Sequence, residues 1–488
     1  MKKIFAISLA LVALVISSCQ DFLEINQDPN NAPTATPALT FPAGVTSAAA
    51  RFVSNYNIMG GMWVQYWAQN NGSNQYKVFD AYSVQQATNN PDFNELYSGS
   101  LRDLQYTRDA AKASGDWNMY LMGTVMQAYV FQMLADTYDM IPFDEALKGS
   151  DNFHPHFRAG QEIYDSLIVR IDNALGKDFD AATNTDPGTS DFLFGGDMET
   201  WFKFANTMKL KLYLRQIYAR QTVAESGINA VYANGVGFLD TDAAMDQFTD
   251  ADSKSNPLYE ADQRKLNTNQ NIKASKTFVD FLLNNGDPRV DKLFLAGSGG
   301  QRGIEQGNFG APTNVIVPAA ISRALILPTE KAYFMSEAES YFLQAEAAAR
   351  GLGTGDAKSL YDQGVIAAFA RFDLDGSAFV QGGGNYEYPD GTLEENLEAI
   401  AVQKWAALAG IEGLEAFLER NRLGYPVYND GGYEAGDYVI GQLVYPVGGV
   451  TGTGNYPKRL LFPETERNRN PNTPAEVSFL TKVWWDKK

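Results

Sequence analysis

Residues 328–372 read PTEKAYFMSEAESYFLQAEAAARGLGTGDAKSLYDQGVIAAFARF. Apolar residues recur at helical spacing on both sides of Gly351-Leu352-Gly353, a segment typical of a helix end followed by a turn. The pattern predicts two helices, over residues 328–350 and 356–372, that pack against each other as an antiparallel pair.

Helix pairs of this kind are expected along most of the chain. Helical periodicity predicts pairs over residues 92–113 with 118–138, 161–175 with 198–220 and 393–408 with 412–420, and shorter helices over 45–57, 225–234 and 273–285. Trp201 and Trp405 each open a Trp-x-x-large-small pattern, which is typical of a tetratricopeptide helix. The sequence therefore predicts an all-α fold of tetratricopeptide-like helix pairs. The lack of regularly alternating strands and helices argues against a TIM barrel or a Rossmann fold.

Long irregular stretches separate the predicted helices. Residues 296–318, 379–391 and 426–457 are rich in Gly, and the last two also carry several Tyr. Loops of this length are uncommon in compact domains unless they serve a function. We therefore expect a helical scaffold whose ligand-binding face is built from these loops.

Composition excludes several classes of function. The 488 residues include 39 Lys and Arg against 58 Asp and Glu, which gives a formal net charge of −19. This acidity argues against a nucleic-acid partner, because phosphate backbones require a basic face. The single Cys excludes an intramolecular disulfide and a zinc site built from several Cys.

The N-terminus has the features of an export signal. Lys2 and Lys3 precede an apolar run over residues 4–16, which is too short to span a bilayer. The run ends in Ile-Ser-Ser-Cys19, which resembles a bacterial lipobox with Cys19 as the acylated residue. The alternative is a general secretory signal with a chance Cys. We expect residues 1–18 to be a lipoprotein signal peptide, residues 19–42 a lipidated tether rich in Pro and Asn, and residues 43–488 one helical-repeat binding domain.

The densest cluster of aromatic and amide side chains lies early in the chain. Sugar recognition uses this mixture, because flat rings cover the apolar face of a pyranose and amides pair with its hydroxyls. Trp63 and Trp67 are four residues apart, and this helical spacing equally favours two rings buried on one face of a helix. Residues 70–76 follow the predicted helix and are expected to be exposed. The predicted ligand-binding residues are Trp63, Trp67, Asn70, Asn71, Asn74 and Tyr76.

Other groups that could carry chemistry fit structural roles better. The pair His154 and His156 lacks further ligands nearby, so no metal site and no cofactor are predicted. Glu339 and Glu346 lie seven residues apart on one helix face, where a packing or solvated role is commoner than a hydrolase pair. Lys404, with Arg420 and Arg422, could bind an anion, but such groups usually pair with nearby acids, here Glu412, Glu415 or Glu419.

Several segments in order resemble the SusD/RagB family of outer-membrane nutrient-binding lipoproteins of Bacteroidetes. The N-terminal segment CQDFLEINQDPNN (19–31) resembles the family's lipidated start, and residues 403–426 give the closest match. Further matching segments are LADTYDMIPFDEAL (134–147), WFKFANTMKL (201–210), residues 333–351, RLLFP (459–463) and NPN (470–472).

The resemblance implies a non-catalytic lipoprotein of the outer membrane that faces the cell exterior. It implies that the protein captures a glycan and delivers it to a SusC-like TonB-dependent transporter, without being an enzyme. Two alternatives remain at this level: a surface-anchored all-α glycoside hydrolase, and a peptide-binding member of the same family. The sequence names neither the ligand nor the partner chain.

Overall fold

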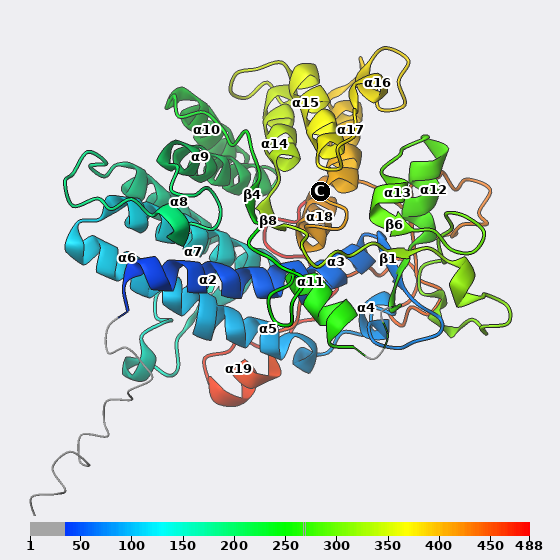
Figure 1. The fold of residues 1–488 in the computed structure, drawn as a ribbon, viewed down its shortest axis with the longest axis horizontal. Coiled ribbons are helices and arrows are strands. Elements are labelled where there is room, and N and C mark those ends of the chain that lie inside the picture. The colour runs from blue at the N-terminus through cyan, green and yellow to red at the C-terminus, as the bar shows by residue number, and fades with distance from the viewer. Residues whose placement is uncertain (1–34, 267, 269) are drawn as a thin grey trace, which may run out of the picture.

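The computed structural model describes residues 35–266, 268 and 270–488 (Figure 1). The predicted signal peptide, the lipidation site Cys19 and residues 19–34 of the predicted tether lie outside the described residues. Residues 37–42, which we predicted as the end of the tether, instead begin the first described helix. Pro37 suits a first helical position, and Phe41 is fully buried, with its ring edge-on to Trp201 at 5.8 Å. Burial of this ring fixes the start of the helix.

Helices make up most of the regular structure, as predicted. The α-helices are α2 (Pro37–Arg51), α3 (Asn57–Trp63), α4 (Lys77–Asp80), α5 (Asn90–Glu95), α6 (Arg102–Ser114), α7 (Trp117–Tyr138), α8 (Gly160–Leu175), α9 (Met198–Arg215), α10 (Gln221–Ala233), α11 (Pro257–Tyr259), α12 (Lys276–Asn284), α13 (Val290–Leu293), α14 (Glu337–Ala349), α15 (Ala357–Ala370), α16 (Ser377–Val380), α17 (Leu393–Ala407), α18 (Gly413–Leu423) and α19 (Glu464–Arg469). They are joined by π-helical segments, which include η2 (Phe52–Tyr56), η4 (Leu96–Leu101) and η7 (Glu260–Arg264). None of the described helices combines the length and apolarity needed to cross a membrane.

Residues that end or cap a helix lie between the paired helices, as the sequence predicts. Gly115 ends α6 at φ 75°, and the carboxylate of Asp116 then accepts a hydrogen bond from the Met119 N–H to cap α7. Gly351, at φ 72°, turns the chain between α14 and α15. The pairs α6–α7, α9–α10 and α14–α15 pack as neighbours (Figure 1). Helix α7 is buried along most of its length and lies at the centre of the scaffold.

Within the described residues, ten short strands form small sheets that the sequence did not predict. The strands are β1 (Trp67–Gln69), β2 (Met140–Pro142), β3 (Phe157–Ala159), β4 (Ala243–Met245), β5 (Ile272–Ala274), β6 (Phe294–Leu295), β7 (Arg323–Ala324), β8 (Ala332–Met335), β9 (Tyr428–Asn429) and β10 (Leu443–Val444). The largest sheet has the order β1-β5-β7-β6, and β8 pairs with β4. The predicted helices over 328–350 and 273–285 therefore start late, at Glu337 and Lys276, since each is preceded by a paired strand.

Candidate ligand-binding face

Trp63 and Trp67 lie in the core. This position agrees with the alternative prediction, in which the two rings are buried and do not contact a ligand. Their exposed fractions are 1% and 3%. The Trp63 indole N–H donates to the Phe79 carbonyl at 3.2 Å, and its ring meets Phe417 edge-on. Trp67 is not on the same helix, because α3 ends at Trp63 and Trp67 belongs to β1. Neither ring is accessible to a ligand.

The expectation that Asn70 and Tyr76 are exposed is wrong. Only 4% of Asn70 and 6% of Tyr76 are exposed. The Asn70 side chain accepts from the Gly72 N–H at 3.1 Å, which closes a turn, and the Tyr76 N–H donates to Gln69. Burial, reinforced by the nearby Asp262 carboxyl, raises the pKa of Tyr76. The segment folds back onto the core instead of standing in solvent.

Asn71 and Asn74 lie at the surface side of the same segment. Asn71 is half-buried and donates to the carbonyls of Ala311 and Ile316 at 3.1 and 2.7 Å. Asn74 is exposed and lines a hollow of about 350 Å³ with Ser73 and Asn271, among others. Of the six predicted ligand contacts, Asn74 alone is exposed.

Three loop segments meet beside this hollow and form one surface. We call residues 70–85, 296–320 and 428–456 together the loop face, which lies at the right-hand end of Figure 1. The Val447 N–H donates to the Gln306 carbonyl at 2.9 Å, and the Val450 N–H donates to the Ala81 carbonyl at 3.0 Å. These backbone bonds join segments that are more than 100 residues apart in the sequence.

A buried carboxyl group anchors the loop face to the scaffold. Asp80, at the end of α4, is fully buried and accepts hydrogen bonds from the Gln69 N–H, the Gly307 N–H and the Gln306 side chain. Burial raises the pKa of Asp80 to about 7, although these three donors act in the opposite direction. The carboxyl thus titrates near neutral pH.

Tyrosine rings form the aromatic part of the loop face. Tyr428 and Tyr456 are stacked, and Tyr445 lies edge-on to Tyr456 at a centroid distance of 6.0 Å. All three are half-buried, and they cover Tyr82, which is fully buried. The Arg420 guanidinium lies 3.8 Å from the centre of the Tyr428 ring. The rings are held by packing, and Tyr456 and Arg420 both pack against the Tyr428 ring.

Polar groups surround the same rings. The Tyr456 hydroxyl donates to the exposed carboxylate of Asp430. The Tyr445 hydroxyl lies 3.1 Å from the Thr451 hydroxyl and accepts from the Gly452 N–H at 2.7 Å. Asn455 is exposed next to them. Rings flanked by hydroxyl, amide and carboxylate groups suit a sugar, whose faces are apolar and whose edges carry hydroxyls.

Sequence reasoning identified this loop but did not choose its residues. The Tyr content of residues 426–457 was a usable signal. The stacking of Tyr428 on Tyr456, 28 residues later, depends on how the loop folds back, which is not visible in local patterns.

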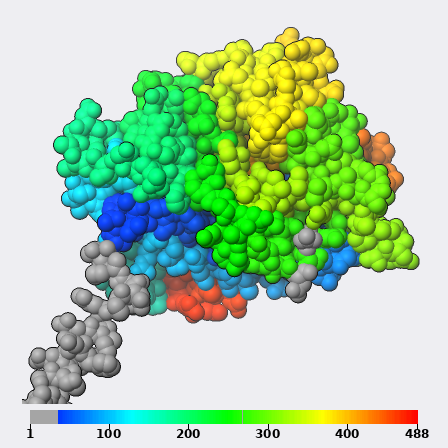
Figure 2. All heavy atoms as spheres, in the orientation of Figure 1, coloured from blue at the N-terminus to red at the C-terminus, as the bar shows by residue number. Residues whose placement is uncertain are grey.

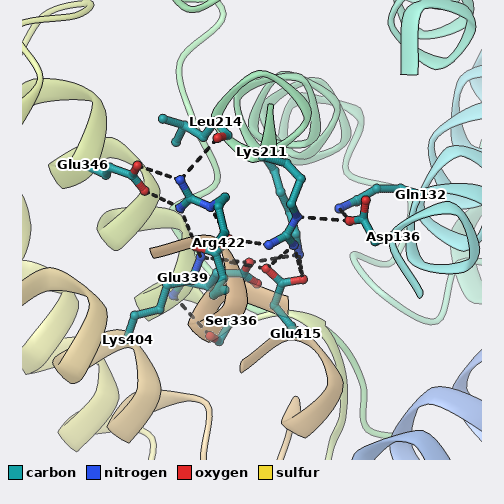
Figure 3. A network of polar contacts seen from close by, with 12 residues as sticks. Gln132, Asp136, Lys211, Leu214, Ser336, Glu339, Glu346, Lys404, Glu415 and Arg422 are labelled. Atoms are coloured by element: carbon teal, nitrogen blue, oxygen red, sulfur yellow. Dashed lines mark hydrogen bonds and ion pairs between the residues drawn. The ribbon is translucent and has the colours of Figure 1, made fainter. Parts of the chain in front are cut away.

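The scaffold carboxylates that could have suggested a hydrolase form a buried charge network (Figure 3). Arg215 pairs with Asp136 at 3.0 Å and with Glu415 at 2.7 Å, and Arg422 pairs with Glu346 at 2.5 Å. We call the following nine residues the central charge network: Asp136, Lys211, Arg215, Glu339, Glu346, Lys404, Glu415, Glu419 and Arg422. They come from α7, α9, α14, α17 and α18, so their charges join five helices.

This network confirms the packing interpretation of Glu339 and Glu346 and the pairing of Lys404 and Arg422 with acids. Glu412, close to the network, has a pKa raised well above its usual range by burial and by the charge of Glu339. The pKa of Glu419 is instead lowered, because Arg422, Lys404 and Arg215 outweigh the effect of burial.

The His pair has a local partner. The His156 Nδ1 atom lies 2.9 Å from the Glu145 carboxylate, and both side chains are exposed. Within the part of the chain that the structure describes, no three His, Cys, Asp or Glu side chains are grouped to hold a metal ion.

Comparisons with known proteins agree with the helical fold. A sequence profile of the SusD-like family, described as starch-binding and associating with the outer membrane, matches residues 29–446. A chitin-binding protein of known structure is 23% identical, with a TM-score of 0.72, and the match covers 92% of this chain and 99% of that one. No enzyme family is indicated, and no curated protein matches the chain.

Two further solved structures have the same fold. A chitin-binding SusD homolog from Flavobacterium johnsoniae is 19% identical with a TM-score of 0.72, over 91% of this chain and 98% of that one. A SusD homolog from Bacteroides uniformis is 19% identical with a TM-score of 0.71, over 92% and 100%. Because the family profile covers most of the chain and the architecture agrees with it, this protein belongs to the SusD/RagB-like family.

Proposed function

We propose that this protein is a non-catalytic lipoprotein of the outer membrane that captures a glycan on its loop face at the cell exterior. The observation that carries the proposal is the cluster of the half-buried residues Tyr428, Tyr445 and Tyr456, flanked by Asp430 and Asn455. The starch-binding description of the family and the chitin-binding relatives support a carbohydrate ligand over a peptide.

We further propose that Asn74 contributes to the same site. It is exposed on the loop face, and the hollow that it lines contains hydroxyl and amide side chains from residues 73–75 and 271. Trp63, Trp67, Asn70 and Tyr76 act beneath the site by holding its backbone, since their side chains are buried.

The binding proposal is tested with a panel of maltooligosaccharides, chitooligosaccharides and short peptides. We expect at least one oligosaccharide series to bind, as measured by calorimetry, and chromatography of the mixture to show the oligosaccharide unchanged. Binding of peptides alone would contradict the choice of ligand, and release of shorter sugars would contradict a non-catalytic role.

We also propose that a SusC-like TonB-dependent transporter receives the glycan. The family membership supports this partner. The test is purification of the tagged lipoprotein from outer membranes in mild detergent, in which an outer-membrane transporter is expected to copurify in a fixed ratio. Recovery of the lipoprotein alone would count against the partner.

A further inference from the structure

A second cavity, away from the tyrosine rings of the loop face, has the size of a ligand site. It has a volume of about 550 Å³ and is enclosed by α2, η2 and the segment from Met245 to Lys265. Ligand pockets in proteins commonly have volumes between about 300 and 1,000 Å³. In Figure 2 the green surface of the segment around residues 245–265 lies next to the blue surface of α2.

Both walls of this cavity contain π-helical turns. Ser54 of η2 lines it next to Arg51, the last residue of α2, and Glu260 and Ala261 line it from η7. Single π-helical turns inside helices are rare and occur often at functional sites. Residues of two such turns, η2 and η7, therefore line this one cavity.

The lining joins apolar surface to polar and charged side chains, of which Glu260 is acidic and Arg51, Lys254 and Lys265 are basic. Phe192, Met245 and Phe248 supply apolar walls. Glu260 is 7% exposed, and its Oε2 atom has no hydrogen-bond partner among the described residues. The buried Nε atom of Arg51 also has no partner among them, although its Nη1 atom lies 3.6 Å from Asp92. A buried polar atom without a partner costs free energy that a ligand can recover.

The wall that contains Glu260 is braced before any ligand arrives. Glu260 Oε1 accepts from the Ser255 N–H at 3.3 Å and pairs with Arg264 Nε at 3.1 Å. Arg264 in turn donates to Asp250 and to the Ser255 hydroxyl. This bracing fixes the backbone of the wall, and a preorganised wall reduces the entropy that binding would otherwise cost.

The two buried atoms without hydrogen-bond partners, Glu260 Oε2 and Arg51 Nε, indicate which class of ligand suits the cavity. The Glu260 oxygen can only accept a hydrogen bond, and the Arg51 Nε–H can only donate one. Glu260 repels an anion, and Arg51, Lys254 and Lys265 repel a cation, so a ligand of either single charge meets a repelling group in the lining. Sugar hydroxyls both donate and accept, and a pyranose also offers an apolar face to Phe192 or Phe248.

We propose that this cavity is a second carbohydrate-binding subsite, with Glu260 and Arg51 contacting sugar hydroxyls. The inference rests on the proposed function, since it assumes that the protein binds glycans. A bound glycan would then contact the protein at two separate places, this cavity and the tyrosine rings of the loop face.

The test maps both sites at once by hydrogen–deuterium exchange with maltoheptaose and with chitohexaose. With a saturating oligosaccharide that binds, amides of residues 245–261 and 428–456 are both expected to exchange more slowly, by about tenfold. Glu260→Gln keeps the shape of the side chain, and Ala50→Phe fills the cavity from α2. Each is expected to remove the protection of 245–261 and leave that of 428–456.

Glu225→Gln is the matched control, because Glu225 lies on α10, far from the cavity, and accepts only from the exposed Gln221. It is expected to change neither region. Protection of 428–456 alone in the wild-type protein would overturn the second subsite and leave the proposed function standing. Protection of 245–261 alone would support the subsite and overturn the role of the tyrosine rings. Protection of neither region by either oligosaccharide would overturn both.

Discussion

Tyr445 is the residue whose replacement best separates binding from folding. Its half-buried ring is edge-on to Tyr456, and its hydroxyl contacts only loop groups. We expect Tyr445→Ala to weaken oligosaccharide binding by about 1–2 kcal/mol, the range for one aromatic contact with its buried area. Thermal unfolding should change much less, and calorimetry with the oligosaccharide measures the affinity.

Tyr76→Ala is the variant with which Tyr445→Ala is compared. Tyr76 is buried and its backbone N–H is held by Gln69, so we expect this substitution to reduce the free energy of unfolding by about 3–5 kcal/mol. If Tyr76→Ala folded normally but lost the ligand while Tyr445→Ala bound normally, the site would lie on the 70–76 segment instead.

Asp80 makes stability depend on pH in a defined direction. Its pKa is raised from 3.8 to about 7 in the folded protein, so between these values the folded state binds a proton that the unfolded chain does not. The contribution of Asp80 to the free energy of unfolding is therefore fully present below about pH 4, and it is lost as the pH rises through about 7.

We expect the difference in stability between wild type and Asp80→Asn to shift in favour of wild type by about 2 kcal/mol from pH 8 to pH 5. Urea unfolding of both proteins at the two pH values measures the shift, because other titrating groups cancel in the difference. Parallel stability curves would show that Asp80 does not titrate in this range.

At the scale of helices, α3 and α18 cross with their backbones in contact. A Cβ atom on Gly60 would lie 2.3 Å from the Gly413 carbonyl carbon, and the Gly413 N–H donates to the Asn57 side chain at 2.7 Å. We expect Gly60→Ala to lower the free energy of unfolding by about 1–3 kcal/mol, because the helices must separate. Gly310→Ala, at an exposed glycine with open space around it, is the control and should stay within about 0.5 kcal/mol of wild type.

The central charge network joins helices that are distant in the sequence. Arg422 is fully buried between Glu346 of α14 and Glu419 of its own helix. Removing Arg422 takes a counter-charge away from two buried carboxylates at once, so we expect Arg422→Met to cost about 3–5 kcal/mol in chemical unfolding. Lys358→Met breaks the partly exposed pair with Asp362 and should cost less than about 1 kcal/mol. Equal effects of the two substitutions would mean that the network adds nothing beyond surface pairs.

At the scale of the whole molecule, the predicted acylation of Cys19 determines where the protein resides. The first described helix, α2, begins at Pro37, so we expect the core to fold whether or not Cys19 is acylated. We expect Cys19→Ala to move the protein from the membrane pellet to the soluble fraction while its thermal unfolding stays unchanged. Pelleting of the variant without detergent would show that another contact holds it at the membrane.

The helical scaffold was largely predictable, because helix pairs carry local signals. The Gly351 turn, the cap at Asp116 and the apolar spacing of α7 are all visible within a few residues. The start of α14 was not predictable, because the preceding strand β8 is stabilised by pairing with β4, almost 90 residues earlier. Short strands of this kind depend on a distant partner.

The candidate site was predicted only as a region. Residues 70–76 do contribute to the loop face, but Asn70 and Tyr76 turn inward because turn hydrogen bonds and Gln69 hold them there. The half-buried residues Tyr428, Tyr445 and Tyr456 gather through contacts across a loop without regular periodicity.

The sequence by itself determined the helical class, the resemblance to an outer-membrane family and the expected lipid anchor, since periodicity, caps and a lipobox are encoded within short windows. The tertiary structure alone decided which aromatic side chains face solvent and which carboxylates are neutralised in the core. Exposure and pairing depend on contacts between segments such as 306 with 447 or Glu346 with Arg422, and no local pattern specifies those contacts.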